Sequence, residues 1–153
     1  MSEEFEAFSK ISRLNREIVI TEKIDGTNAQ IFIGDDGKTI KAGSRTKWLA
    51  PGKATDNFNF AAWVEQNKEE LLKLGPGRHY GEWWGVGIQR RYGLQEKRFS
   101  LFNTSRWSDP AVRPACVGVV PVLYTGPWTT NDYLDAFAGV DNLMFAPAAI
   151  LYK

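Results

Sequence analysis

The chain has 153 residues, 43% of them hydrophobic, which suits one domain with a substantial core and is too short for two. Its net charge of +1 excludes a protein that coats nucleic acid through bulk electrostatic attraction. The acidic start MSEEFEAF does not match a secretion signal, and no apolar run approaches the ~18 residues that span a bilayer. We therefore expect a cytoplasmic chain with no membrane segment.

Three β-rich runs open the chain. Residues 17–24 and 28–34 alternate and are rich in β-branched residues, and GDDGK at 34–38 predicts a hairpin into a third strand at 39–43. Together they predict an antiparallel meander. A loop punctuated by glycine and proline follows over residues 44–56.

The middle and the end of the chain predict two helices and three more strands. Asn57 is a candidate N-cap for a helix that GPG at 75–77 ends, and strands are expected at 78–85, 97–103 and 117–124. A short helix is expected at 131–139. This order predicts an α+β class built on antiparallel sheet, in one domain that covers residues 1–153.

Two residue types occur once each. Cys116 cannot form an internal disulfide and lies in an apolar run, so we expect it to pack in the core. His79 has no second histidine and no cysteine near it in sequence, so we expect a structural, partly buried histidine and no His/Cys metal cluster.

Basic residues gather in two places despite the near-neutral net charge. Residues 38–53 hold five lysines and arginines and no acidic residue, and RRYGLQEKR at 90–98 adds four against Glu96 alone. Both patches suit phosphate; solvated loop charge is the alternative for each.

The stretch TEKIDGTN at 21–28 has two interpretations. Lys-x-Asp-Gly between strands is a common hairpin turn, and taken alone it favours a structural role. A lysine that attacks phosphorus must be neutral, and it also needs a pocket for the group that it captures. Such a pocket calls for an aromatic face for a base and a carboxylate or amide for a ribose.

Four motifs occur in a familiar order: EKIDGTN at 22–28, SRTKWL at 44–49, YGEWWG at 80–85 and RFSLFN at 98–103. Together they resemble the ATP-dependent RNA ligases, in particular the phage-type, nick-sealing branch of the covalent nucleotidyltransferase superfamily. The resemblance runs from about residue 5 to about residue 128. It implies an antiparallel-sheet nucleotidyltransferase (adenylation) domain, with ATP and Mg²⁺ or Mn²⁺ as cofactors and RNA ends or a nicked duplex as partner.

The first motif carries the nucleophile in this resemblance. Lys23 would form a covalent lysyl-AMP, and Glu22 would border the adenine amino group. Asp25 and Asn28 would hold the nucleophile loop and help to position the phosphate or the polynucleotide end. Asn28 resembles RNA ligases more than DNA ligases, which usually have arginine there.

The later motifs supply the rest of the nucleotide site. Arg45 would contact ribose or phosphate through its planar fork of donors, with Lys47 a weaker candidate beside it. Glu82 would bind the ribose, and Phe102 would stack on adenine. Arg90 and Arg91 are candidate phosphate or nucleic-acid contacts; no metal ligand is assigned.

Tryptophans and phenylalanines near these motifs have a simpler interpretation. Trp83, Trp84 and Phe99 are expected in the sheet core or a groove wall, because strand aromatics usually pack. Trp48, in a polar loop, is less easily explained in that way. A carboxylate at Glu82, beside two tryptophans, would be costly to bury unless a partner or ligand satisfied it.

The sequence departs from the family after these motifs. The family continues with a Glu-Gly strand and a Lys-x-Lys strand, whereas the last glutamate here is Glu96 and no Lys or Arg lies between Arg113 and Lys153. The domain is therefore expected to be shortened at its C-terminus, with the apolar tail from residue 141 covering a sheet edge. A truncated or frame-shifted product, a minimal ligase-like protein completed by a second chain or a homodimer, and a nucleotide-binding relic all fit.

Two functions follow from the resemblance. In the first, Lys23 attacks the ATP α-phosphate, AMP passes to an RNA 5′-phosphate, and a 3′-OH seals the break. In the second, the chain is a degenerate or partner-dependent module that binds nucleotide or nucleic acid without ligase turnover. The early motifs favour the first function, and the missing late motifs favour the second.

Overall fold

The computed structural model describes residues 17–127 and 143–147. Nine strands are defined: β1 (Glu17–Glu22), β2 (Thr27–Ile33), β3 (Ile40–Ser44), β4 (Trp48–Leu49), β5 (Gly77–Gly85), β6 (Lys97–Leu101), β7 (Gly118–Val119), β8 (Val122–Pro127) and β9 (Leu143–Pro147). The helices are α1 (Phe60–Gln66), α2 (Lys68–Leu71), the 3-10 turn η1 (Leu72–Leu74) and α3 (Thr104–Trp107). The predicted helix at 131–139 lies outside the described residues.

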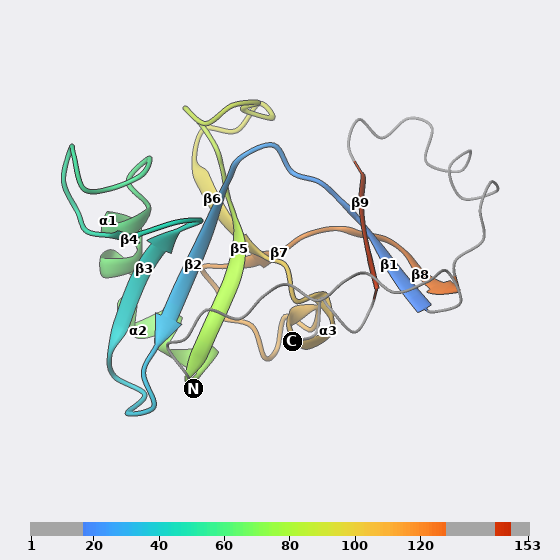
Figure 1. Cartoon of the computed structure of the whole chain (residues 1–153), viewed down its shortest axis with the longest axis horizontal. Coiled ribbons are helices and arrows are strands. Elements are labelled where there is room, and N and C mark those ends of the chain that lie inside the picture. The colour runs from blue at the N-terminus through green and yellow to red at the C-terminus, as the bar shows by residue number, and fades with distance from the viewer. Residues whose placement is uncertain (1–16, 128–142, 148–153) are drawn as a thin grey trace.

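The strands form two sheets (Figure 1). The larger has the order β4-β3-β2-β5-β6-β7, and the smaller has the order β8-β1-β9. Every neighbouring pair is antiparallel except β6 and β7, which run parallel. The predicted α+β class with mainly antiparallel sheet is therefore confirmed.

The predicted meander is wrong for its first strand. β1 does not pair with β2; it pairs with β8 on one side and β9 on the other. Its consecutive residues Val19, Ile20 and Thr21 are all buried, which fits a central strand covered on both faces rather than a strand with one exposed face. Residues 23–26 then carry the chain from the small sheet into the large one.

The run at 117–124 is two strands rather than one. β7 pairs with β6 in the large sheet, and β8 pairs with β1 in the small sheet. The break falls at Val120 and Pro121, where proline has no N–H to donate to a ladder. The Pro121 carbonyl instead accepts a 3.0 Å hydrogen bond from the N–H of Glu22. The chain passes between the two sheets at residues 23–26 and again at residues 120–121, and this hydrogen bond joins it at these two places.

The predicted helix after residue 57 is broken; its N-cap position is Asn59, and the side chain that binds its first N–H groups is Asp56 rather than Asn57. α1 ends at Gln66, and Asn67 separates it from α2, which begins at Lys68. The Asp56 carboxylate accepts hydrogen bonds from the N–H groups of Ala61 and Ala62, at 2.8 and 3.0 Å. Asn57 donates its side-chain amide to Thr27 Oγ1 instead. No helix within the described ranges is long and apolar enough to cross a membrane.

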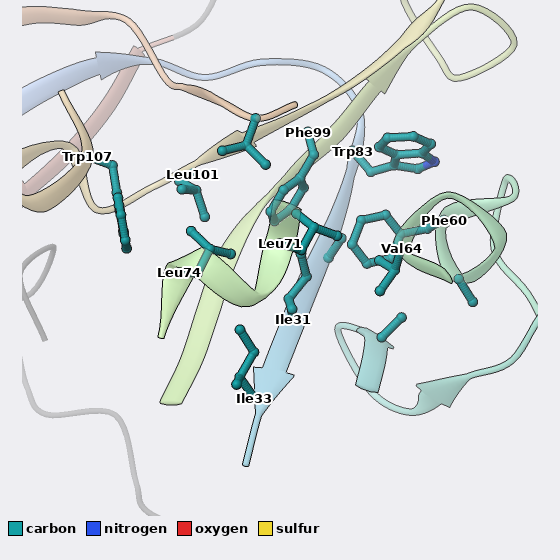
Figure 2. Packing of buried hydrophobic residues seen from close by; sticks show 14 of the residues in the cluster. Ile31, Ile33, Phe60, Val64, Leu71, Leu74, Trp83, Phe99, Leu101 and Trp107 are labelled. Carbon is teal, nitrogen blue, oxygen red and sulfur yellow. The ribbon is translucent and has the colours of Figure 1, made fainter. Parts of the chain in front are cut away.

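The core lies between one face of the large sheet and helices α1 and α2 (Figure 2). Phe60 of α1 contacts Trp83 and Phe99, with ring centroids 5.3 Å away in both pairs. The core placement predicted for these two strand aromatics is confirmed. Trp84 points to the other face, where its indole N–H donates to Ser100 Oγ.

The single histidine and the single cysteine lie where the sequence placed them. His79 is buried near the start of β5, and a ring nitrogen lies 2.8 Å from the Gly75 carbonyl oxygen. Burial lowers the pKa of His79. Cys116 packs against the core, partly buried, and burial raises the pKa of its thiol. The contacts of both residues are thus those of side chains that help to hold the fold together.

We expect Asp56→Ala to lower the free energy of unfolding by about 1–2 kcal/mol, because α1 loses the acceptor for its first N–H groups. Urea denaturation measures the loss. Asp35→Ala, at an exposed hairpin position, is the matched control and should change stability by less than about 0.5 kcal/mol. Equal losses in the two variants would show that Asp56 is not the cap.

Candidate active site

A pocket of about 550 Å³ opens where the chain crosses from the small sheet to the large one. Its wall is formed by residues 23–26, which join the two sheets, by the first two residues of β2, and by one residue each from the turn after β3 and from β5. The lining residues are Lys23, Ile24, Asp25, Gly26, Thr27, Asn28, Arg45 and Glu82. Lysine, arginine and two carboxylates thus converge from three separate parts of the sequence.

Strand register positions the polar side chains. β2 pairs with β5 over seven residues, so that Asn28 lies directly opposite Glu82. Arg45 begins the tight turn after β3, in which Ser44 Oγ accepts from the N–H groups of Thr46 and Lys47. Lys23 follows the last residue of β1 and is exposed to the pocket.

Gly26 brings the Asp25-Gly26 turn against β5. A Cβ atom at residue 26 would lie 2.4 Å from the Trp83 carbonyl oxygen and 2.7 Å from Trp84 Cβ. Only glycine therefore permits this approach of the turn to the strand. Residues 25 and 26 consequently lie beside Glu82, whose carboxylate accepts a hydrogen bond from the N–H of Gly26.

Glu82 is the buried carboxyl group of the pocket, with 9% of its surface exposed. Burial above all, with a smaller contribution from the Asp25 carboxylate, raises the pKa of Glu82 from the ordinary 4.5 to about 7. The hydrogen bond from Gly26 and the positive charge of Lys23 act in the opposite direction. Because its neighbours stabilise the ionised carboxylate only in part, Glu82 is suited to accept hydrogen bonds from a ligand.

The pocket brings together five of the predicted site residues: Lys23, Asp25, Asn28, Arg45 and Glu82. Other predicted residues lie outside its lining. Glu22 is half-buried at the end of β1, and Phe102 is half-buried directly after β6, where its N–H donates to the Tyr80 carbonyl.

The remaining predicted cations also lie outside the lining. Lys47 is exposed in the turn that begins with Arg45, two residues farther along the chain. Arg90 and Arg91 are exposed on the loop between β5 and β6, and the Arg90 guanidinium lies 5.9 Å from the centre of the Tyr92 ring.

Tyr92 contacts the Asp25-Gly26 turn, a contact that the sequence did not predict. Its hydroxyl accepts a 2.7 Å hydrogen bond from the N–H of Asp25, 67 residues earlier. Tyr92 has a positive φ of 53°, unusual for a bulky residue, and its ring packs on Trp84 at 5.3 Å. The β5–β6 loop thus braces the turn that carries Lys23. A Tyr-Gly pair in a polar loop carries no signal for such a contact.

The donor set fits a divalent ion only in part. Mg²⁺ is usually held by one or two carboxylates together with substrate phosphates, and Asp25 and Glu82 supply two carboxylates in the pocket. No group of three or more His, Cys, Asp or Glu that would hold an ion alone occurs within residues 17–127 and 143–147. An ion at this site would depend on phosphate and water oxygens for its other ligands.

Comparison with known proteins assigns the family. The model of the RNA ligase family matches residues 16–144, so the chain belongs to the RNA ligase family. The resemblance inferred from the four motifs is confirmed. No curated protein sequence matches significantly.

Solved structures of the Naegleria gruberi RNA ligase share the fold. A lysine variant with ATP and Mn has a TM-score of 0.61 and 21% identity, and covers 88% of this chain and 46% of its own. A structure with PPi has a TM-score of 0.61 and 19% identity, with coverages of 88% and 47%. A variant with AMP and Mn has a TM-score of 0.60 and 20% identity, with coverages of 90% and 52%. The chain thus spans about half the length of these ligases.

We expect Gly26→Ala to destabilise the protein by about 1–3 kcal/mol, because the new methyl group meets backbone rather than a flexible side chain. Gly118→Ala is the control, since a Cβ there meets Ser100 Oγ at an ordinary 3.4 Å. Thermal unfolding compares the two variants. If Gly26→Ala melts no lower than Gly118→Ala, the close approach to β5 is not needed.

Glu82 should make stability depend on pH. A folded-state pKa near 7, above the ordinary 4.5, means that the folded protein binds the proton more tightly, so stability falls as pH rises from about 4.5 to about 7. Glu82→Gln removes this dependence. The variant should gain stability relative to wild type across that window, by at most about 3 kcal/mol. Urea unfolding along a pH series measures the gain; parallel profiles would contradict the raised pKa.

Proposed function

We propose that the chain is an adenylyltransferase of the RNA ligase type, in which Lys23 is the nucleophile. The observation that carries the proposal is the pocket, where Lys23 lies with Arg45 and the buried Glu82. A nucleophile, a cation for phosphate and an acceptor for ribose hydroxyls are the three groups that capture of AMP requires.

The proposed first step is adenylation of the protein. The neutral Lys23 Nζ donates its electron pair to the α-phosphorus of ATP, so that an N–P bond forms. The bond from that phosphorus to the oxygen bridging to the β-phosphate breaks, and pyrophosphate leaves with those electrons. The nitrogen gives up its extra proton to water. The product is a lysyl-AMP.

The two later steps would complete a ligation. The 5′-phosphate of an RNA end displaces Lys23 from the AMP phosphorus and becomes activated by AMP. A 3′-OH then attacks that activated phosphate, and AMP leaves as the phosphodiester bond forms. For these steps we propose RNA ends or a nicked duplex as the substrate, in keeping with the family.

The residues around Lys23 have proposed roles in binding. Glu82 accepts hydrogen bonds from the ribose, and Arg45 contacts ribose or phosphate. Asp25 and Asn28 hold the nucleophile turn and position phosphate or the polynucleotide end.

Other roles rest on the resemblance, because the residues lie outside the pocket lining. They are the contact of Glu22 with the adenine amino group, stacking of Phe102 on adenine, and phosphate or nucleic-acid contacts by Lys47, Arg90 and Arg91.

ATP and a divalent ion, Mg²⁺ or Mn²⁺, are the proposed cofactors. Related structures were solved with ATP and Mn, with AMP and Mn and with PPi, which supports this choice. The carboxylates of Asp25 and Glu82 would contribute to holding the ion. A bound ion supplies positive charge that offsets the negative charge of the phosphates.

The proposal places residues 1–153 in one nucleotidyltransferase domain. The pocket lining, as described, supplies two cations, Lys23 and Arg45, against two carboxylates. We therefore propose that a second copy of the chain, or a second chain, adds phosphate contacts during ligation.

Intact-protein mass spectrometry after incubation with ATP and Mg²⁺ or Mn²⁺ tests the first step. We expect a mass gain of one AMP that Lys23→Ala abolishes and that Lys38→Ala, at an exposed hairpin residue, retains. Calorimetry with ATP separates the alternatives. Binding without an adduct would favour the nucleotide-binding module, and neither binding nor adduct would reject both functions.

A further inference from the structure

The face of the large sheet opposite its core carries a group of aromatic and basic side chains. Ala29, Ile31 and Ile33 of β2 point to the core, so the alternate residues of β2 point to the other face. The register extends this face across β3, β4 and β5. The aromatic strip, as we call it, consists of Phe32, Lys41, Trp48, Arg78 and Tyr80.

The members of the aromatic strip contact one another. The rings of Phe32 and Trp48 meet edge to face, with centroids 6.0 Å apart. The Arg78 guanidinium lies 5.2 Å from the centre of the Phe32 ring and 5.8 Å from that of Trp48. The Lys41 ammonium lies 5.5 Å from the Trp48 ring. Each positive charge is therefore held against a ring.

The strip remains accessible to solvent. Trp48 is 48% exposed and Tyr80 is 51% exposed, although both are large rings that would gain from burial. Gly43 leaves room for the indole, because a Cβ there would come within 3.2 Å of Trp48 Cε3. Trp48 is thus seated on the sheet with much of its surface uncovered, which a purely structural role does not explain.

The charge on this face favours an anion. Glu82 is the one acidic residue among the outward-facing positions of β2, β3, β4 and β5, and it lies at the pocket end. Lys41 and Arg78 lie at the other end, with no carboxylate between them. An anionic ligand with flat rings matches both the cations and the exposed aromatic faces.

We propose that the aromatic strip binds an unpaired stretch of the RNA strand that enters the pocket. Bases would stack on Trp48 and Tyr80, and Lys41 and Arg78 would neutralise phosphates. An intact duplex cannot offer these contacts, because its bases are stacked on one another. The choice of RNA rests on the proposed function; the preference for a polyanion with unpaired bases rests on the strip.

The strip is aligned with the pocket. Asn28, which lines the pocket, and Phe32 lie on the same face of β2, four residues apart. At ~3.3 Å per residue this is about 13 Å. Gln30 and Tyr80, which are directly paired, lie between these ends. A strand on the strip would therefore run along β2 toward Lys23.

Fluorescence anisotropy of a labelled single-stranded RNA of about ten nucleotides tests the proposal, with the same RNA annealed to its complement as the duplex arm. We expect Trp48→Ala and Tyr80→Ala each to raise the Kd for the single strand by about fivefold or more. Phe58→Ala removes an aromatic that is 45% exposed and outside the strip, and should leave this Kd unchanged.

A second measurement tests the cations. Arg78→Gln should reduce the dependence of log Kd on log salt concentration by about 0.7, the value for one phosphate contact on a single strand. Lys73→Gln, at an exposed residue of η1, should leave the slope unchanged. Circular dichroism melting confirms that the variants are folded.

Two outcomes would overturn the proposal: an unchanged single-strand Kd in both Trp48→Ala and Tyr80→Ala, or equal weakening of single strand and duplex. Its failure is distinguishable from failure of the proposed function, because strip variants leave the pocket residues intact. They should still gain AMP from ATP at the wild-type level. If the strip variants bind single-stranded RNA as tightly as wild type and still gain AMP, only the proposal for the aromatic strip would be rejected.

Discussion

The close approach of the Asp25-Gly26 turn to the backbone of β5 is the contact on which the site depends. Because residue 26 has no side chain, the turn lies against Trp83 and Trp84, and its N–H reaches the Glu82 carboxylate. β2 then starts in register with β5 and brings Asn28 opposite Glu82. The contact of Gly26 with the backbone of β5 thus brings Lys23, just after β1 of the small sheet, and Glu82, in β5 of the large sheet, into one pocket.

The charges of the pocket are closely balanced, and this sets its chemistry. Two cations face two carboxylates, one of which is buried and holds its proton up to near neutral pH. When Glu82 is protonated the pocket is more attractive to phosphate, and when it is ionised the pocket is a better acceptor for hydroxyl groups. A polyphosphate would still benefit from further positive charge, which a divalent ion brings.

The sequence predicted local features better than contacts between distant segments. Most strands and the core positions of Trp83 and Phe99 follow from alternation and neighbouring residues. The partners of β1 do not, because periodicity defines a strand and not its neighbour. The contact of Tyr92 with Asp25 joins residues far apart in the chain and depends on a loop conformation that no local pattern encodes. Asp56 caps α1 because the chain enters the helix through an irregular turn, whereas Asn57 is bonded to Thr27.

The pairing of β1 has a consequence for the order of folding. The hairpin of β2 and β3 joins neighbours in sequence, whereas Glu17 pairs with Pro127 and Glu22 with Leu143. Because closing a long loop costs more entropy than closing a short one, we expect the small sheet to form after the hairpin of β2 and β3. During synthesis Lys23 leaves the ribosome before Arg45 and Glu82, yet the strand that ends beside it waits for partners more than a hundred residues later. The strand that leads directly to Lys23 is thus expected to be held in place only after residues 122–127 and 143–147 have been made.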